Sequence, residues 1–265
     1  MAQSALLTIM TAAARKAARS LKRDFGEVEN LQVSRKGPAD FVSAADKRAE
    51  KAIYEELLKS RPSYSFLMEE SGEVKGTDGQ HRWIIDPLDG TTNFLHSIPM
   101  FAVSIGLERN GQLVGGVIYN PITDELFTAE RGKGAFLNNR RLRVSGRVHL
   151  ADAVAVTGIK QTTNARNDAT TISEVSAINA ASSGVRRTGS AALDLAYVAA
   201  GRFDAMWERD LAPWDIAAGM LMVREAGGLV TDLNNKDAKP ESGTILAANE
   251  KLHTQMRKAL KTVQS

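Results

Sequence analysis

The sequence contains no cysteine, and this absence removes three kinds of chemistry at once. Without thiols the chain can form no disulfide, no thiolate metal site and no cysteine nucleophile. A chain without cysteine is compatible with a reducing compartment, and we expect a cytoplasmic location.

Histidine is also scarce. The chain has four histidines, and they are far apart in the sequence with no H-E-x-x-H pairing. A histidine-rich zinc site is therefore not expected. Any bound metal should be held mainly by oxygen atoms, which favours magnesium, calcium or manganese.

Long apolar runs are absent as well. No stretch approaches the ~18 apolar residues of a membrane span, so we expect no membrane partner. The N-terminal segment has its apolar residues before its arginines and lysines, which is the reverse of a secretory signal. The segment could be a transit peptide, but its amphipathic pattern continues smoothly to Phe25 and favours a first helix of the fold.

The charge balance is mild. The 265 residues carry a formal net charge of +3. This excess is too small to indicate nucleic-acid binding by itself, and we do not expect a nucleic acid as substrate. The most basic run, 139–143, is followed by Arg147. It could be a solvated hairpin edge or a binding patch, and edge strands often carry such charges.

Hydrophobic patterning divides the chain into two parts. Helices predicted at 5–25 and 44–60 precede a meander of short strands that looks antiparallel and contains an Asn110-Gly111 hairpin turn. From 153 onward strands and helices alternate, which is typical of an α/β layout; one of these helices is predicted at 171–181. We place the boundary near Ser145-Gly146. This gives an α+β half over 1–146 and an α/β half over 147–265.

The strongest chemical signal is the segment Trp83–Asn93. Its apolar strand is predicted to end at Asp86, and loops after strand ends commonly carry ligands. Asp86 and Asp89, with the Leu88 carbonyl between them, could converge on a hard cation. If Thr91 opens a helix, its unpaired amides could cradle a phosphate. The same residues also make a good turn, so this segment alone leaves a plain turn open.

Three other acidic positions could join this segment. Glu69 follows a strand predicted to end at Met68, while Asp46 and Asp215 each lie at the start of a predicted helix. Each position has a purely structural alternative. Adjacent glutamates are commonly solvated, and an acid in a first helical turn commonly caps the helix or offsets its dipole.

These segments together resemble the inositol monophosphatase family. The family signature W-[IV]-[IV]-D-P-[IL]-D-G-T-x-N-F is matched by Trp83–Phe94, and the signature W-D-x-A-A-G is matched by Trp214–Gly219. The stretch P-A-D-x-V-[ST]-x-x-D is matched by Pro38–Asp46. Two separated signatures in the correct order are hard to explain by coincidence.

The resemblance implies a role for each matching residue. The implied ligands of two or three Mg²⁺ ions are Glu69, Asp86, the Leu88 carbonyl, Asp89 and Asp215. The implied catalytic residues, which position and deprotonate the attacking water, are Thr91, Asp46 and Glu69. The implied contacts to the phosphate and the sugar ring are Asp89, Gly90, Thr91, Gly189, Ser190, Ala191, Glu208 and Asp215. Lys36 stands where the family has a lysine near the metals.

The resemblance also implies a fold and an activity. The fold is the mixed α/β, layered αβαβα sandwich of sugar phosphatases. The activity is Mg²⁺-dependent, lithium-sensitive hydrolysis of a small phosphate monoester, with myo-inositol 1-phosphate as the expected substrate and a homodimer as the expected assembly. Related phosphatases of fructose 1,6-bisphosphate, NADP or histidinol phosphate share these ligands. A regulatory role through contact with protein or RNA is a further alternative.

Overall fold

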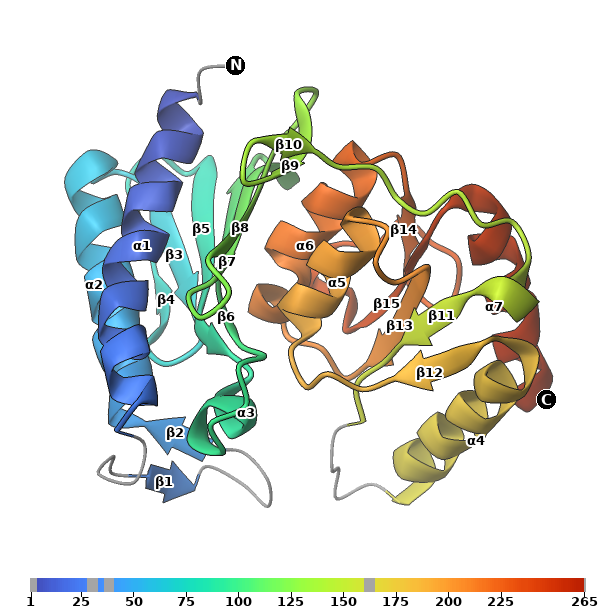
Figure 1. Cartoon of the computed structure of the whole chain (residues 1–265). Helices are drawn as coiled ribbons and strands as arrows, with labels where there is room; N and C mark the ends of the chain where they lie inside the picture. The colour runs from blue at the N-terminus through green and yellow to red at the C-terminus, as the bar shows by residue number, and fades with distance from the viewer. Residues whose placement is uncertain (1–3, 28–32, 36–40, 160–164, 265) are drawn as a thin grey trace.

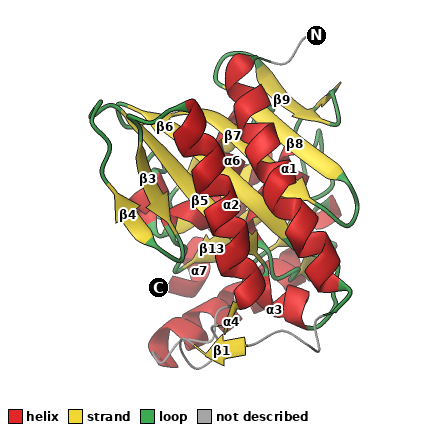
Figure 2. Cartoon of the chain, turned by 90° about the vertical axis from the view of Figure 1, so that its left-hand side faces the viewer, coloured by secondary structure: helices red, strands yellow, loops and turns green. Residues whose placement is uncertain are grey.

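The computed structural model describes residues 4–27, 33–35, 41–159 and 165–264. The loop expected at 36–40, including Lys36, lies outside these ranges. The first two helices, α1 (Ala5–Phe25) and α2 (Ala44–Ser60), have the predicted bounds. Figure 2 shows them side by side across one face of a sheet. Among the described residues, no helix combines the length and the apolar character needed to cross a membrane.

The sheet beneath these helices has eight strands in the order β10-β9-β8-β7-β6-β5-β3-β4. Their bounds are β3 (Ser65–Met68), β4 (Gly72–Val74), β5 (His81–Asp89), β6 (Ala102–Arg109), β7 (Gln112–Asn120), β8 (Glu125–Glu130), β9 (Gly134–Leu137) and β10 (Arg140–Arg141). The predicted turn between β6 and β7 is confirmed. Asn110 and Gly111 both have positive φ angles, 50° and 74°, as a tight hairpin requires.

One pair of strands corrects the expectation of an antiparallel sheet. β3 and β5 are parallel, because β4 folds back along the outer side of β3 and the chain must then cross to the inner side to start β5. β4 and β10 were not predicted, since strands of two or three residues have too few positions to show alternation. A separate ribbon of β1 (Val33–Arg35) and β2 (Phe41–Ser43) was also missed.

The second sheet has five strands in the order β12-β11-β13-β15-β14 and is mixed. Its strands are β11 (Val154–Val156), β12 (Gly184–Arg186), β13 (Ala205–Arg209), β14 (Leu229–Thr231) and β15 (Thr244–Ala248). Two helices, α4 (Ala165–Ala181) and α7 (Glu250–Gln264), cover its outer face (Figure 1). The start of α4 was predicted too late, at Thr171, because residues 165–170 offer no apolar periodicity.

Two central helices, α5 (Ala191–Ala199) and α6 (Pro213–Glu225), lie between the two sheets (Figure 1). The layers therefore run helix, sheet, helix, sheet, helix, which confirms the predicted αβαβα sandwich. Glycines allow the central layer to pack closely. A Cβ on Gly106 would lie 3.0 Å from the Ala217 Cβ, and one on Gly116 would lie 3.0 Å from the Ala218 carbonyl oxygen.

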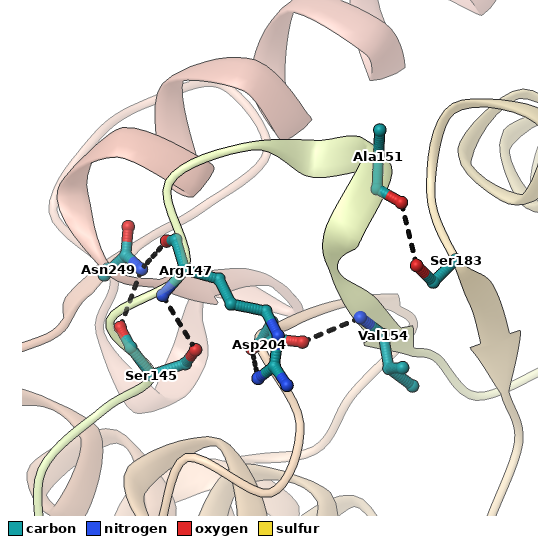
Figure 3. A network of polar contacts seen from close by, with 7 residues as sticks. All are labelled: Ser145, Arg147, Ala151, Val154, Ser183, Asp204 and Asn249. Carbon is teal, nitrogen blue, oxygen red and sulfur yellow. Dashed lines mark hydrogen bonds and ion pairs between the residues drawn. The ribbon is translucent and has the colours of Figure 1, made fainter.

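The segment between the two sheets is held by polar contacts (Figure 3). Asp204 accepts hydrogen bonds from the Val154 amide at 2.7 Å and from Arg147 at 3.1 Å. The Asn249 side chain donates to the carbonyls of Ser145 and Arg147, each at 2.8 Å. The boundary predicted near Ser145-Gly146 falls in this segment. The division into two halves stays a prediction, since one hydrophobic core includes residues from both sides of it.

The packing of α5 on α6 predicts the effect of a single methyl group at Gly219. A Cβ there would lie 2.5 Å from the Leu195 Cβ, and overpacking of this kind costs about 1–3 kcal/mol. We expect Gly219→Ala to lower the free energy of unfolding by about that amount in urea denaturation, although alanine is the better helix former. The matched control is Gly146→Ala, where a Cβ would meet no atom within 4 Å. Equal stability of the two variants would contradict the close approach of the helices.

Candidate active site

The end of β5 carries the first part of the site. Its pairing with β6 is interrupted between Asp86 and Asp89, so Pro87 and Leu88 leave the regular ladder. Asp86 is buried, and its Oδ1 accepts a hydrogen bond from the Leu88 amide at 2.9 Å. The carboxylates of Asp86 and Asp89 and the carbonyl of Leu88 therefore lie at the irregular end of β5.

Gly90 links this turn to a short helix, α3 (Thr91–Leu95). Its φ angle is 96°, and a Cβ would lie 2.8 Å from the Met100 carbonyl oxygen, so only glycine fits. The helix begins at Thr91, which meets the condition for a phosphate cradle that was set from the sequence. The Thr91 hydroxyl lies 3.0 Å from the Leu88 carbonyl oxygen and 3.4 Å from the Asp46 carboxylate. The structure thus brings Asp46, from α2, to Thr91.

Glu50 is a member of this region that sequence reasoning missed. It is buried, and its carboxylate accepts hydrogen bonds from the Glu70 amide at 2.8 Å and from the Ser71 hydroxyl. It therefore anchors the loop after Glu69. Glu50 lies four residues after Asp46, and this spacing places both acids on one helix face. That spacing was the sequence feature that could have identified Glu50 as part of this region.

Five carboxylates from four segments of the chain gather at the end of β5. Burial raises the pKa of Asp86 well above its ordinary value, and the nearby charges of Glu69, Asp89, Asp215 and Asp46 raise this pKa further. The sequence-predicted acids are therefore close enough to interact. Like charges in such an arrangement disfavour the ionisation of one another.

Asp215 lies in the first turn of α6, and its Oδ2 accepts a hydrogen bond from the Ala212 amide at 2.9 Å. Asp215 therefore caps α6, which is the structural alternative considered for this residue from the sequence. Capping employs one carboxylate oxygen and is compatible with a second role at the site.

The donor set at this site fits a hard cation, because all of its atoms are carboxylate or carbonyl oxygens. The side chains are not arranged as a closed site. Within the described residues, no group of three or more acidic or histidine side chains is placed so that it could hold a metal ion. Neighbouring carboxylates repel one another, and a divalent cation would offset that repulsion. The assignment of individual metal ligands stays a prediction.

The second part of the site comes from the start of α5. Asp89 Oδ2 accepts hydrogen bonds from the Ser190 hydroxyl at 2.5 Å and from the Ala192 amide at 2.7 Å. Ser190 also caps the helix. Gly189 has a φ angle of 88°, and a Cβ there would lie 3.0 Å from the Asn93 side-chain nitrogen. The predicted ring-contact loop, 189–191, therefore lies directly beside the acidic turn.

Glu208 lies in β13 and is buried. Its carboxylate occupies the space beside Gly158, where an added Cβ would fall 1.9 Å from Glu208 Oε1. Gly158 therefore leaves room for the side chain that was expected to contact the sugar ring.

Asp194 was missed from the sequence, although it is buried at 1% exposure. Burial raises its pKa well above the ordinary value, the charges of Glu208 and Asp89 raise it too, and a hydrogen bond from the Thr188 hydroxyl acts in the opposite direction. That bond is 2.6 Å long. The available signal was an acid inside an otherwise apolar helix.

The chain is similar in sequence and in structure to known proteins. A model of the inositol monophosphatase family matches residues 2–265. An inositol-1-monophosphatase of Mesorhizobium japonicum is 59% identical over 261 residues, covering 98% of each chain. The Nus factor SuhB of Escherichia coli is 46% identical over 248 residues, covering 93% of this chain and 92% of the relative. A crystal structure of the extragenic suppressor protein SuhB from Bartonella henselae has 58% identity and a TM-score of 0.94, covering 97% of this chain and 99% of that one.

The raised pKa of Asp194 predicts how folding stability depends on pH. A folded-state pKa above the unfolded value stabilises the protein at low pH, and this contribution is lost as pH rises through the folded-state pKa. We expect Asp194→Asn to remove this loss, because asparagine retains an acceptor for Thr188 and cannot ionise. Urea denaturation from pH ~4 upward should show the wild type losing stability relative to the variant. The exposed control, Asp152→Asn, should follow the wild type, and parallel curves for all three proteins would contradict the prediction.

Proposed function

Because this chain belongs to the inositol monophosphatase family, we propose that it hydrolyses myo-inositol 1-phosphate to myo-inositol and phosphate in a Mg²⁺-dependent reaction. The observation that carries this proposal is the gathering of Glu69, Asp86, Asp89 and Asp215 at the end of β5, beside Thr91 and Asp46. An oxygen-rich site of this kind suits magnesium.

Two or three Mg²⁺ ions would be held by two overlapping ligand sets. The first consists of Glu69, Asp86 and the Leu88 carbonyl, and the second of Asp86, Asp89 and Asp215. When bound, the ions would neutralise the phosphate and lower the pKa of a water molecule. Asp86 would belong to both sets, and its proximity to the charges of Glu69, Asp89 and Asp215 supports this.

Proton removal from the attacking water falls to Thr91, Asp46 and Glu69. The Thr91 hydroxyl is within hydrogen-bond distance of Asp46, so it can pass its own proton to that carboxylate as it accepts one from the water. Glu69 would orient the same water from the adjacent end of the parallel strand β3. This arrangement needs no histidine.

Substrate orientation would come from both parts of the site. The amides of Gly90 and Thr91 at the start of α3 would bind the phosphate. The loop 189–191 and Glu208 would contact the ring, with carboxylate oxygens accepting hydrogen bonds from its hydroxyls. A ring with several hydroxyl donors suits this acceptor-rich wall, which favours a cyclitol or sugar phosphate over a purine nucleotide.

The proposal is tested by phosphate release from a panel of substrates with Mg²⁺, with EDTA and with added lithium. The panel should contain inositol 1-phosphate, fructose 1,6-bisphosphate, NADP and histidinol phosphate. Release led by inositol 1-phosphate that needs Mg²⁺ and is inhibited by lithium is expected. Faster phosphate release from another compound of the panel would identify that compound, and not inositol 1-phosphate, as the preferred substrate. Phosphate release that persists in EDTA would overturn the metal dependence.

The role assigned to Asp215 predicts a large loss of activity on removal of one charge. We expect Asp215→Asn to lower kcat/KM by at least about a hundredfold, as loss of a metal ligand should. The variant keeps an acceptor for the Ala212 amide, so the melting temperature should change little. Asp210→Asn alters an exposed acid in the same segment and should keep full activity. An active, Mg²⁺-dependent Asp215→Asn enzyme would refute the ligand assignment.

A second role, in regulation, is favoured by one specific observation: the 46% identity to proteins named Nus factor SuhB. Catalysis and regulation can be separated with Asp86→Asn, which we expect to abolish phosphatase activity. The chain and this variant would each be expressed in E. coli lacking its own relative. If both proteins can substitute for the missing relative, a regulatory role independent of catalysis is supported. If neither protein can, this role is contradicted.

The family resemblance also carries the proposals of a homodimer and of a cytoplasmic location. The complete lack of cysteine supports a reducing compartment. Light scattering after size exclusion would test the dimer.

A further inference from the structure

A depression of about 240 Å³ lies far from the acidic site. It is lined by Leu137, Arg140, Arg141, Leu142, Arg143, Ala200 and Arg202. Four of these seven residues are arginines, three are apolar and none is acidic. The fold brings Arg202, from a segment about sixty residues away, beside the basic run that was identified in the sequence.

Three of the arginines carry uncompensated charge. Arg140, Arg141 and Arg143 are exposed, and in the described part of the chain no carboxylate lies within ion-pair distance of their guanidinium groups. Arg202 differs, since it pairs with Glu125 and lies over the Tyr197 ring, 4.8 Å from its centroid. That pairing and the negative end of the α5 dipole reduce the local potential, but three positive charges are left.

One arginine lies close against the backbone of a neighbouring turn. The guanidinium of Arg141 lies against Gly134, where an added Cβ would fall 3.1 Å from its Nη2 atom. The Gly134 amide donates to Glu225 at 2.8 Å, which fixes this turn to α6. Arg141 thus rests on a backbone surface that a larger residue would occupy. A guanidinium supported in this way loses less freedom on binding a ligand.

We propose that this depression is a second anion site that binds a phosphate or diphosphate group. Arginine is suited to such groups, because its planar guanidinium donates two parallel hydrogen bonds to neighbouring phosphate oxygens. The volume of about 240 Å³ is below the roughly 300–1,000 Å³ of sites for whole drug-sized ligands. The site therefore accommodates the phosphate end of a ligand, with Leu137 and Leu142 as an apolar floor.

The second site is separate from the acidic one. Asp89 contacts the first turn of α5 through Ala192, whereas Ala200, just beyond the other end of that helix, lines the depression. Nine helical residues span roughly 13 Å. Figure 1 shows β9 and β10 at the end of the molecule opposite α3. An anion bound here would not touch the proposed metal ligands.

The experiment is calorimetric titration of the full chain with pyrophosphate and, separately, inorganic phosphate, in EDTA and without Mg²⁺. These conditions make the result independent of the proposed phosphatase activity. We expect saturable binding of one pyrophosphate per chain that weakens at high salt. Arg141→Gln/Arg143→Gln should weaken this binding at least tenfold.

The matched control is Arg19→Gln/Arg109→Gln, which removes the same charge from two exposed arginines outside the depression. Its affinity should stay within twofold of the wild type. The proposal is overturned if the wild type binds no pyrophosphate, if the control weakens binding as much as the test pair, or if the test pair binds normally. Circular dichroism and phosphate release would show that both double variants are folded, and arginine side-chain NMR signals of the wild type should shift at Arg141 and Arg143.

Discussion

The carboxylate of Asp89 joins the two parts of the candidate active site. It leaves the end of a strand in the first sheet and accepts hydrogen bonds from Ser190 and Ala192 at the first turn of α5. A carboxylate at a helix N-terminus is stabilised by the unpaired amides and the helix dipole. Because α5 lies between the two sheets, this contact sets the position of the ring-contact loop relative to the acidic turn. A substrate bound there would touch residues from both parts of the chain.

The same region concentrates negative charge beyond what folding alone would favour. Asp86 is buried among four other acids, and Asp194 is buried near Asp89 and Glu208. Both carboxyl groups have raised pKa values, so the folded state disfavours their ionisation. Proteins retain such costly groups where function requires them, and activity is then gained at the expense of stability. A cation would turn this repulsion into attraction, which explains why an acidic cluster and an open arrangement of its side chains occur together.

Local patterns were sufficient for much of the fold. The bounds of α1 and α2 and the Asn110-Gly111 turn were predicted, because each depends on residues that are neighbours in sequence. The parallel pairing of β3 with β5 was not, since it follows from the path of β4 around the sheet edge. Glu50 and Asp194 were missed for a related reason. A local signal existed for each residue, but it did not indicate their contacts with Glu70 and Thr188.

The amino-acid sequence limits the chemistry available to this protein: no thiol, few histidines, and acids at the end of an apolar strand. It also determined the family, through two separated signatures. Packing of the layers brings the acids together, places Asp89 against α5, and adds Arg202 to the basic run around a depression. The reason is physical. Residue type and short-range periodicity are written along the chain, whereas burial and electrostatic coupling arise between segments that meet only after the layers have packed.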